Sequence, residues 1–117
     1  MVRIPKDAFL LRIHLGESDR HHGKPLYEAI VLKARDLHVA GATVLRGSMG
    51  FGAHSRIHTT KVLSISNDLP VVVEIIDCRE KIDEFMPHLD EMVKEGLVTL
   101  ERVQVLRYRA GNGPNDR

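Results

Sequence analysis

The chain has 117 residues, which is enough for one two-layer domain with a single core and too few for two. It is 43% hydrophobic and 28% charged, ordinary values for a globular protein, and its formal net charge is only +1. Because acidic and basic residues are interspersed, no concentrated basic surface for DNA or RNA is expected. The single cysteine, Cys78, excludes an intrachain disulfide framework and fits a reducing compartment. The N-terminal segment resembles neither a signal peptide nor a membrane span, so we expect a cytoplasmic protein.

The first half of the chain predicts a strand, a helix and a second strand. Residues 8–15 alternate with the period of two that is typical of a half-buried strand. Residues 25–38 carry apolar side chains at helical spacing, and Pro25 suits the first turn of a helix. After Gly41, the second strand is expected from residue 42 to about residue 46 and beyond.

The second half predicts two strands and the clearest helix. The stretch KVLSIS at 61–66 has strand character, and the β-branched run at 71–77 is typical of a central strand that is buried on both faces. Apolar residues at 82–93 then recur at i, i+3, i+4 and i+7, which predicts a helix that Gly96 terminates. Pro87 lies inside this pattern and is expected to kink or split the helix.

A last strand, or a hairpin-like pair of short ones, is expected at 97–108, followed by a frayed polar tail at 110–117. The order of elements predicts an α+β fold, a ferredoxin-like βαββαβ sandwich with two helices on one face of an antiparallel sheet. It forms a single domain over 1–117, with its core at about 8–109. The opposite sheet face also carries apolar side chains, so we expect other copies of the chain to cover it. These side chains are Leu10, Val72 and Ile76.

Six stretches of the chain resemble the PII-like proteins of the uncharacterised family numbered 190 among domains of unknown function. They cover nearly all of residues 9–108 in order: LLRIHLGESD, GKPLYEAIVLKAR, AGATVLRGSMGFG, SRIHT, LPVVVEIID and LDEMVKEGLVTLERVQVLRY. The resemblance implies a homotrimer, related to the PII nitrogen-regulatory signalling proteins, that binds adenine nucleotides in clefts between subunits. It also implies a loop, here at 47–60, that docks on a partner such as a membrane transporter, a channel or an enzyme.

Three short motifs are similar to PII itself. GATV at 41–44 is similar to the start of the second PII strand, GFG at 50–52 to the base of the partner-binding loop, and RYRAG at 107–111 to the PII ending Arg-Ile-Arg-Thr-Gly. In PII the two arginines of that ending contact nucleotide phosphates. The resemblance therefore implies phosphate contacts for both arginines here and a position near the base or ribose for the threonine of GATV. The ligand-binding residues so implied include Gly41, Thr43, Arg107 and Arg109.

One departure from PII concerns the turn before the last strand. PII proteins carry Gly-x-Gly-Lys there, and its amides and lysine hold phosphates, whereas this chain has KEGLVTLE at 94–101. A site for ATP in this chain would therefore lack one of the main phosphate contacts of PII. The departure favours AMP, ADP, a cyclic nucleotide or no nucleotide at all over ATP, and no cofactor is expected to be required.

The glycine-rich stretch GSMGFGAHSRIH at 47–58 has two interpretations. In the first, Gly50 and Gly52 let the backbone approach an anion closely, and Arg46 and Arg56 supply charge-assisted contacts to it. In the second, the stretch is a solvent-exposed turn whose glycines only permit bends. The resemblance to PII favours the ligand- and partner-binding loop.

A divalent-metal site is the alternative, because CutA-type trimers share this fold and are associated with divalent cations. His54 and His58 are its candidate ligands. In an extended strand they would lie about 13 Å apart, too far to share one ion, so His21 or His22 would have to join them through folding or from a neighbouring subunit.

Other residues give no sign of catalysis. Cys78 has a cation beside it in Arg79, but the sequence nominates no base for it. Paired-carboxylate, Ser-His-Asp, Walker and CxxC patterns are all absent from the sequence, so we expect no enzyme. Glu74 lies in an apolar run and is predicted to pair across the sheet with Arg12 or Arg107.

Overall fold

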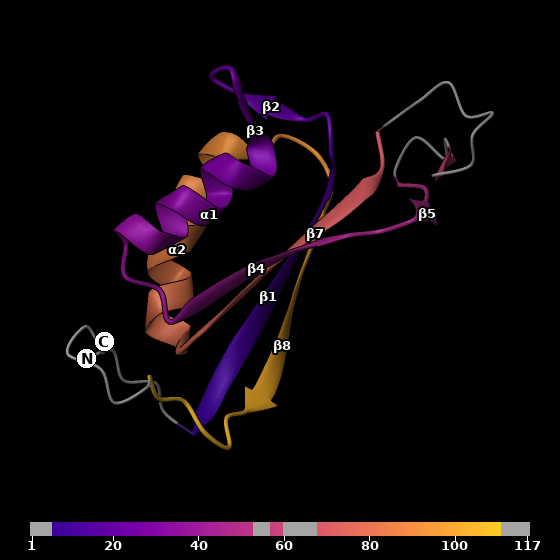
Figure 1. Ribbon diagram of the computed structural model, residues 1–117. Helices are drawn as coiled ribbons and strands as arrows, with labels where there is room; N and C mark the ends of the chain where they lie inside the picture. Colours follow the sequence, from indigo (N-terminus) through magenta and orange to yellow (C-terminus); the bar gives the residue numbers. More distant parts are fainter. Residues whose placement is uncertain (1–5, 53–56, 60–67, 111–117) are drawn as a thin grey trace.

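One antiparallel sheet with two helices on one face makes up the computed structural model, which describes residues 6–52, 57–59 and 68–110 (Figure 1). The main elements are β1 (Asp7–Gly16), α1 (Leu26–Asp36), β4 (Gly41–Arg46), β7 (Pro70–Asp77), α2 (Arg79–Met92) and β8 (Leu97–Gln104). The strands lie in the order β4-β7-β1-β8, and each neighbouring pair is antiparallel. This order confirms the predicted ferredoxin-like βαββαβ sandwich.

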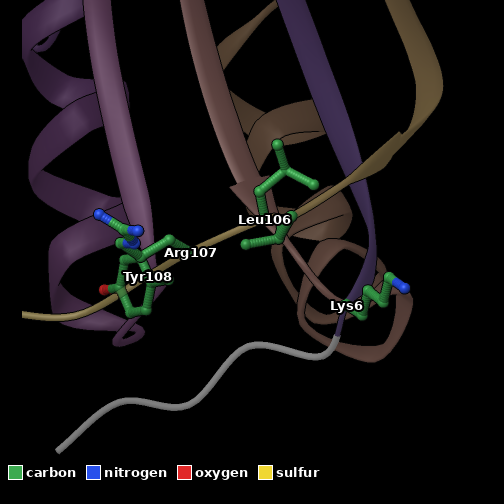
Figure 2. A pocket seen from close by; sticks show the side chains of 5 residues that line it. Lys6, Leu106, Arg107 and Tyr108 are labelled. Atoms are coloured by element: carbon green, nitrogen blue, oxygen red, sulfur yellow. The ribbon is translucent and has the colours of Figure 1, made fainter.

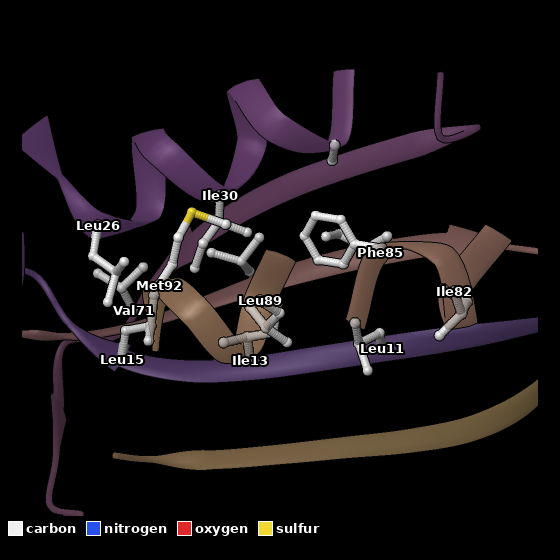
Figure 3. Close-up of a cluster of buried hydrophobic side chains, with 13 residues drawn as sticks. Leu11, Ile13, Leu15, Leu26, Ile30, Val71, Ile82, Phe85, Leu89 and Met92 are labelled. Carbon is white, nitrogen blue, oxygen red and sulfur yellow. The ribbon is translucent and has the colours of Figure 1, made fainter. Parts of the chain in front are cut away.

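The core lies between the helices and the sheet (Figure 3). On β7, Val71, Val73 and Ile75 point toward the helices and are buried, while the residues between them are half-buried. β7 lies between β4 and β1, so the prediction of a central strand is confirmed. The helices contribute the other half of the core. Their buried side chains are Leu26, Ile30, Ala34, Ile82, Phe85, Leu89 and Met92.

Both predicted helices form, with shifted boundaries. Pro25 lies just before α1 as its N-cap, because the helix begins at Leu26. α2 begins at Arg79 and runs through Pro87 without being split. The apolar stripe of α2 is buried on both sides of the proline, and this packing holds the helix together although one backbone hydrogen bond is lost. Among the described residues, no helix is long and apolar enough to span a bilayer.

The structure adds two small hairpins that the sequence does not predict. β2 (Arg20–His21) pairs with β3 (Lys24–Pro25), and β5 (Met49–Gly50) pairs with β6 (His58–Thr59). The last strand is shorter than expected, because β8 ends at Gln104 and the residues to 110 have no regular structure. The expected strand at 61–66 lies outside the described residues, as does the tail from 111 on.

The sheet face opposite the helices carries a charged centre flanked by apolar side chains. Arg12 on β1 donates to Glu74 on β7 at 2.9 Å and also pairs with Glu101 on β8. The hydrogen bond to Glu74, which has the larger effect, and the one to Glu101 both raise the pKa of the Arg12 guanidinium above its ordinary value. The predicted partner of Glu74 is thus Arg12 and not Arg107. The apolar residues Leu10, Val72 and Ile76 lie on this face, half-buried, beside the more exposed Leu45 and Leu97.

Candidate functional site

β4 separates the predicted ligand residues into two groups. Gly41 begins the strand and Arg46 ends it, five residues later. At about 3.3 Å per residue, the two ends are about 17 Å apart. The C-terminal segment that carries the arginines lies near the Gly41 end of β4, whereas the loop with its glycines begins at the Arg46 end (Figure 1).

The first half-site lies where the chain passes back beside the start of β4. The Tyr108 hydroxyl donates to the Ala40 carbonyl at 2.7 Å, and the Val105 amide donates to the Lys6 carbonyl at 2.6 Å. These two bonds fix residues 105–108 around an open cavity of about 440 Å³. Its lining residues are Lys6, Val105, Leu106, Arg107 and Tyr108.

The chemistry of this cavity suits an anion with a flat or apolar part. Figure 2 shows Arg107 and Tyr108 on one side of Leu106 and Lys6 on the other. Leu106 is 87% exposed, which is unusual for a leucine beside a cavity. Arg107 and Arg109 are also exposed, and neither forms an ion pair within the described residues. The cavity therefore offers an exposed cation and a partly exposed aromatic ring.

The second half-site lies at the other end of β4, where the loop begins. Arg46 pairs with Glu17 at 2.6 Å between Nη2 and Oε2, and the Gly47 amide donates to the Pro70 carbonyl at 2.7 Å. A Cβ at Gly47 would lie 2.9 Å from Cγ of Pro70, so this close approach requires glycine. The backbone here is therefore held against β7 before the loop departs.

The loop glycines lie near this end. Gly50 is in β5, where an added Cβ would lie 3.2 Å from Cγ of Pro70, while Gly52 is exposed with open space around it. Arg56 lies outside the described residues. Thr43 lies between the two half-sites, exposed on the outer sheet face and opposite Glu74.

The turn at 16–19, which the sequence did not predict, contacts residues at both ends of the segment that joins β4 to β7 and contains the loop at 47–60. The Glu17 amide donates to the Leu69 carbonyl at 2.8 Å, and the Ser18 amide donates to Oδ1 of Asp68 at 2.7 Å. The Glu17 carboxylate also holds Arg46 at the departing end. One signal was present in the sequence, because GESD is a cluster of turn-forming residues directly after a strand.

The candidate metal ligands are only partly described by the structure. His58 lies in β6 opposite Gly50, while His54 and the side chain of His58 lie outside the described residues. His21 and His22 stack on each other with 4.0 Å between ring centroids. In the part of the chain that the structure describes, no three His, Cys, Asp or Glu side chains lie close enough to hold an ion.

Comparison with known sequences identifies the family. The sequence model of DUF190, described as "Uncharacterized ACR", matches residues 8–105. The chain belongs to the DUF190 family. A UPF0166 protein of Aquifex aeolicus is 40% identical over 97 residues, which cover 83% of this chain and 91% of that protein. The resemblance stated from the sequence is therefore confirmed.

Solved structures share the fold of this DUF190 chain at low sequence identity. The nitrogen regulatory PII-like protein CPII from Thiomonas intermedia K12, bound to ADP, AMP and bicarbonate, superposes with a TM-score of 0.58 at 18% identity. That alignment covers 86% of this chain and 90% of CPII. The B. subtilis GlnK–ATP complex gives a TM-score of 0.54 at 13% identity, covering 86% and 85% of the two chains. The PII-like fold is thus established for this protein.

Proposed function

We propose that this DUF190 protein is a PII-like regulatory homotrimer that binds AMP or ADP in the clefts between its subunits. The separation along β4 carries the proposal, because the two half-sites lie about 17 Å apart on one strand and the cavity at the Arg107 end is open. The Arg46 end of one subunit and the Arg107 end of its neighbour form one complete site if they meet at a subunit boundary. The exposed Leu106 beside Arg107 then becomes part of the covered boundary.

The outer sheet face supplies the surface for this assembly. It combines partly exposed apolar side chains, Leu45 and Leu97 among them, with a central arginine whose charge is matched by two glutamates. Such a face is costly to leave in water and suits burial against identical copies. Closed symmetry repeats the same cleft at every boundary.

The ligand class follows from the chemistry of the half-sites and from related folds. Guanidinium groups bind phosphate through paired hydrogen bonds, and the Tyr108 ring offers a flat apolar surface. CPII was solved with ADP and AMP, and GlnK with ATP, which supports an adenine nucleotide here. The missing Gly-x-Gly-Lys turn favours the nucleotides with fewer phosphates.

Regulation would act through the ion pair of Arg46 with Glu17. A phosphate that binds Arg46 competes with the Glu17 carboxylate, and Glu17 also holds the returning end of the loop through Leu69. Nucleotide binding therefore favours loop conformations in which this pair is open. The altered loop at 47–60 would then engage a partner, which we propose is a membrane transporter or channel.

Mixing two defective variants tests the shared cleft. Calorimetric titration with AMP and ADP should show strong loss of affinity for Arg46→Ala and for Arg107→Ala, and for Arg109→Ala as well. Arg35→Ala, which removes an exposed arginine on α1, should bind normally. When the Arg46 and Arg107 variants are unfolded and refolded together, about a quarter of the clefts regain both arginines.

Recovery of about a quarter of the wild-type binding sites supports a cleft built from two subunits. If the mixture recovers nothing while each single variant is defective and trimeric, both arginines act within one chain and the proposed cleft is wrong. Normal binding by all three variants would show that the PII residues do not carry over to this protein.

A further inference from the structure

The β2–β3 hairpin and helix α1 enclose a groove that the proposed nucleotide cleft does not use. The hairpin turns through His22 and Gly23, which both have positive φ, 49° and 81°. This is the backbone of a tight two-residue hairpin, in which positive φ is uncommon for residues other than glycine, although histidine tolerates it better than most. The turn sets the ring of His22 almost parallel to that of His21, at an interplanar angle of 13°.

The groove has an apolar floor and a basic rim. Its cavity is about 320 Å³, and the floor consists of Ala29 and Leu32 from α1 with Met92 from the end of α2. The rim carries His21, His22 and Lys24 from the hairpin and Lys33 from α1. Asp36 is the one carboxylate among the lining residues.

The two lysines of the rim have no anionic partner in the part of the chain that the structure describes. Among the described residues, neither Lys24 nor Lys33 forms an ion pair, in contrast to Lys81 on α2, which pairs with Glu84 at 3.8 Å. The lysines come from two different elements that line the groove, one from the hairpin and one from the helix. An anion placed between them would gain two charge-assisted contacts without displacing an existing one.

We propose that this groove binds a small organic anion, in which a carboxylate or phosphate is carried on an apolar or aromatic body. The charged end lies between Lys24 and Lys33, and the body covers Leu32 and Met92 on the floor. Repulsion from Asp36 keeps the charged end away from that side of the rim. All of these residues belong to one chain and lie on the helical side of the sheet, so the proposal is independent of the cleft between subunits.

NMR titration with benzoate, phenyl phosphate and neutral benzyl alcohol tests the groove on the intact protein. We expect the two anions to shift the His21 and His22 ring signals and the Met92 methyl signal in a saturable way, while benzyl alcohol binds at least about tenfold more weakly. The tighter of the two anions shows whether the natural ligand is a carboxylate or a phosphate.

Charge-removing variants separate this site from general electrostatic attraction. Lys33→Met and Lys24→Met should each weaken anion binding by about tenfold or more, the loss expected for one charge-assisted contact. Arg35→Met removes a cation from the same helix outside the groove and should leave binding unchanged. An equal loss with Arg35→Met, equal binding of benzyl alcohol, or no saturable shift at these residues would overturn the proposal.

Discussion

Replacing Gly96 with alanine is expected to lower the free energy of unfolding by about 2–3 kcal/mol, for two separable reasons. Gly96 has φ 132°, which an L side chain rarely adopts, and its added Cβ would lie 2.9 Å from the His14 carbonyl oxygen. That carbonyl belongs to β1, which is fixed by its ladder to β8 directly after Gly96. Because the clashing atom is backbone, no side-chain rotation can relieve the contact.

Two other glycines act as matched controls. Gly23 also has positive φ but nothing within 4 Å of its added Cβ, so Gly23→Ala should cost only about 1 kcal/mol. Gly52 has open space and no positive φ, and Gly52→Ala should stay within about 0.5 kcal/mol of the parent. Gly96→Ala should therefore cost more than Gly23→Ala, because it adds the backbone clash and its φ is also less accessible to an L residue.

Thermal and chemical denaturation at one fixed protein concentration give these differences, since assembly makes stability depend on concentration. For a chain of this size, 1 kcal/mol lowers Tm by about 4 °C, so Gly96→Ala should melt about 8–12 °C below the parent. If Gly96→Ala is no less stable than Gly23→Ala, the contact with His14 is not what requires this glycine. A Gly96→Ala protein that stays folded but loses AMP affinity would show that this turn binds phosphate after all.

Three further substitutions test separate parts of the structure. Leu45→Asp puts a charge on the outer sheet face at a residue that is 48% exposed. Sedimentation should show folded monomers of the variant, whereas we expect trimers of the parent. A trimeric variant would exclude this face from the subunit interface. Glu17→Gln weakens the ion pair with Arg46 and should raise the affinity for AMP a few-fold, measured by calorimetry. Weaker binding would mean that Glu17 contributes to nucleotide binding instead of competing with it. Asp77→Ala leaves the amides of Ala40 and Cys78 without their buried acceptor and should lower the free energy of unfolding by about 2–4 kcal/mol, measured by denaturation. A loss below about 1 kcal/mol would show that water replaces the carboxylate.

The sheet and helices were predictable because their burial is periodic. The alternation at β1, the apolar run of β7 and the stripe of α2 each identify an element from its own residues. The β2–β3 hairpin has two residues per strand and no apolar face, so its sequence has no hydrophobic periodicity that could predict it. The end of β8 was also missed, since apolar residues continue to Leu106 after the ladder with β1 has stopped at Gln104.

The candidate site was predictable only in pieces. The motifs similar to PII supply Gly41, Thr43 and Arg107, and the glycine-rich stretch supplies the loop end, but no pattern in the sequence states how far apart these pieces lie. That distance follows from the straight path of β4, whose register with β7 places Gly41 opposite Ile76 and Arg46 opposite Val71. Glu17 was missed for a related reason, because its partners are 29 and 52 residues away.

In the proposed mechanism, Glu17 makes the turn at 16–19 the element through which ligand and loop are coupled. Its carboxylate binds the departing end of the loop at Arg46, and its amide binds the returning end at Leu69. A ligand that only touched the loop glycines would leave these bonds intact. A ligand that takes Arg46 from Glu17 removes the side-chain restraint, while the backbone bonds from Glu17 to Leu69 and from Gly47 to Pro70 stay in place. Nucleotide binding and loop opening are then linked through this one ion pair. If opening the loop raises the affinity for the nucleotide by some factor, bound nucleotide must raise the equilibrium constant for loop opening by the same factor.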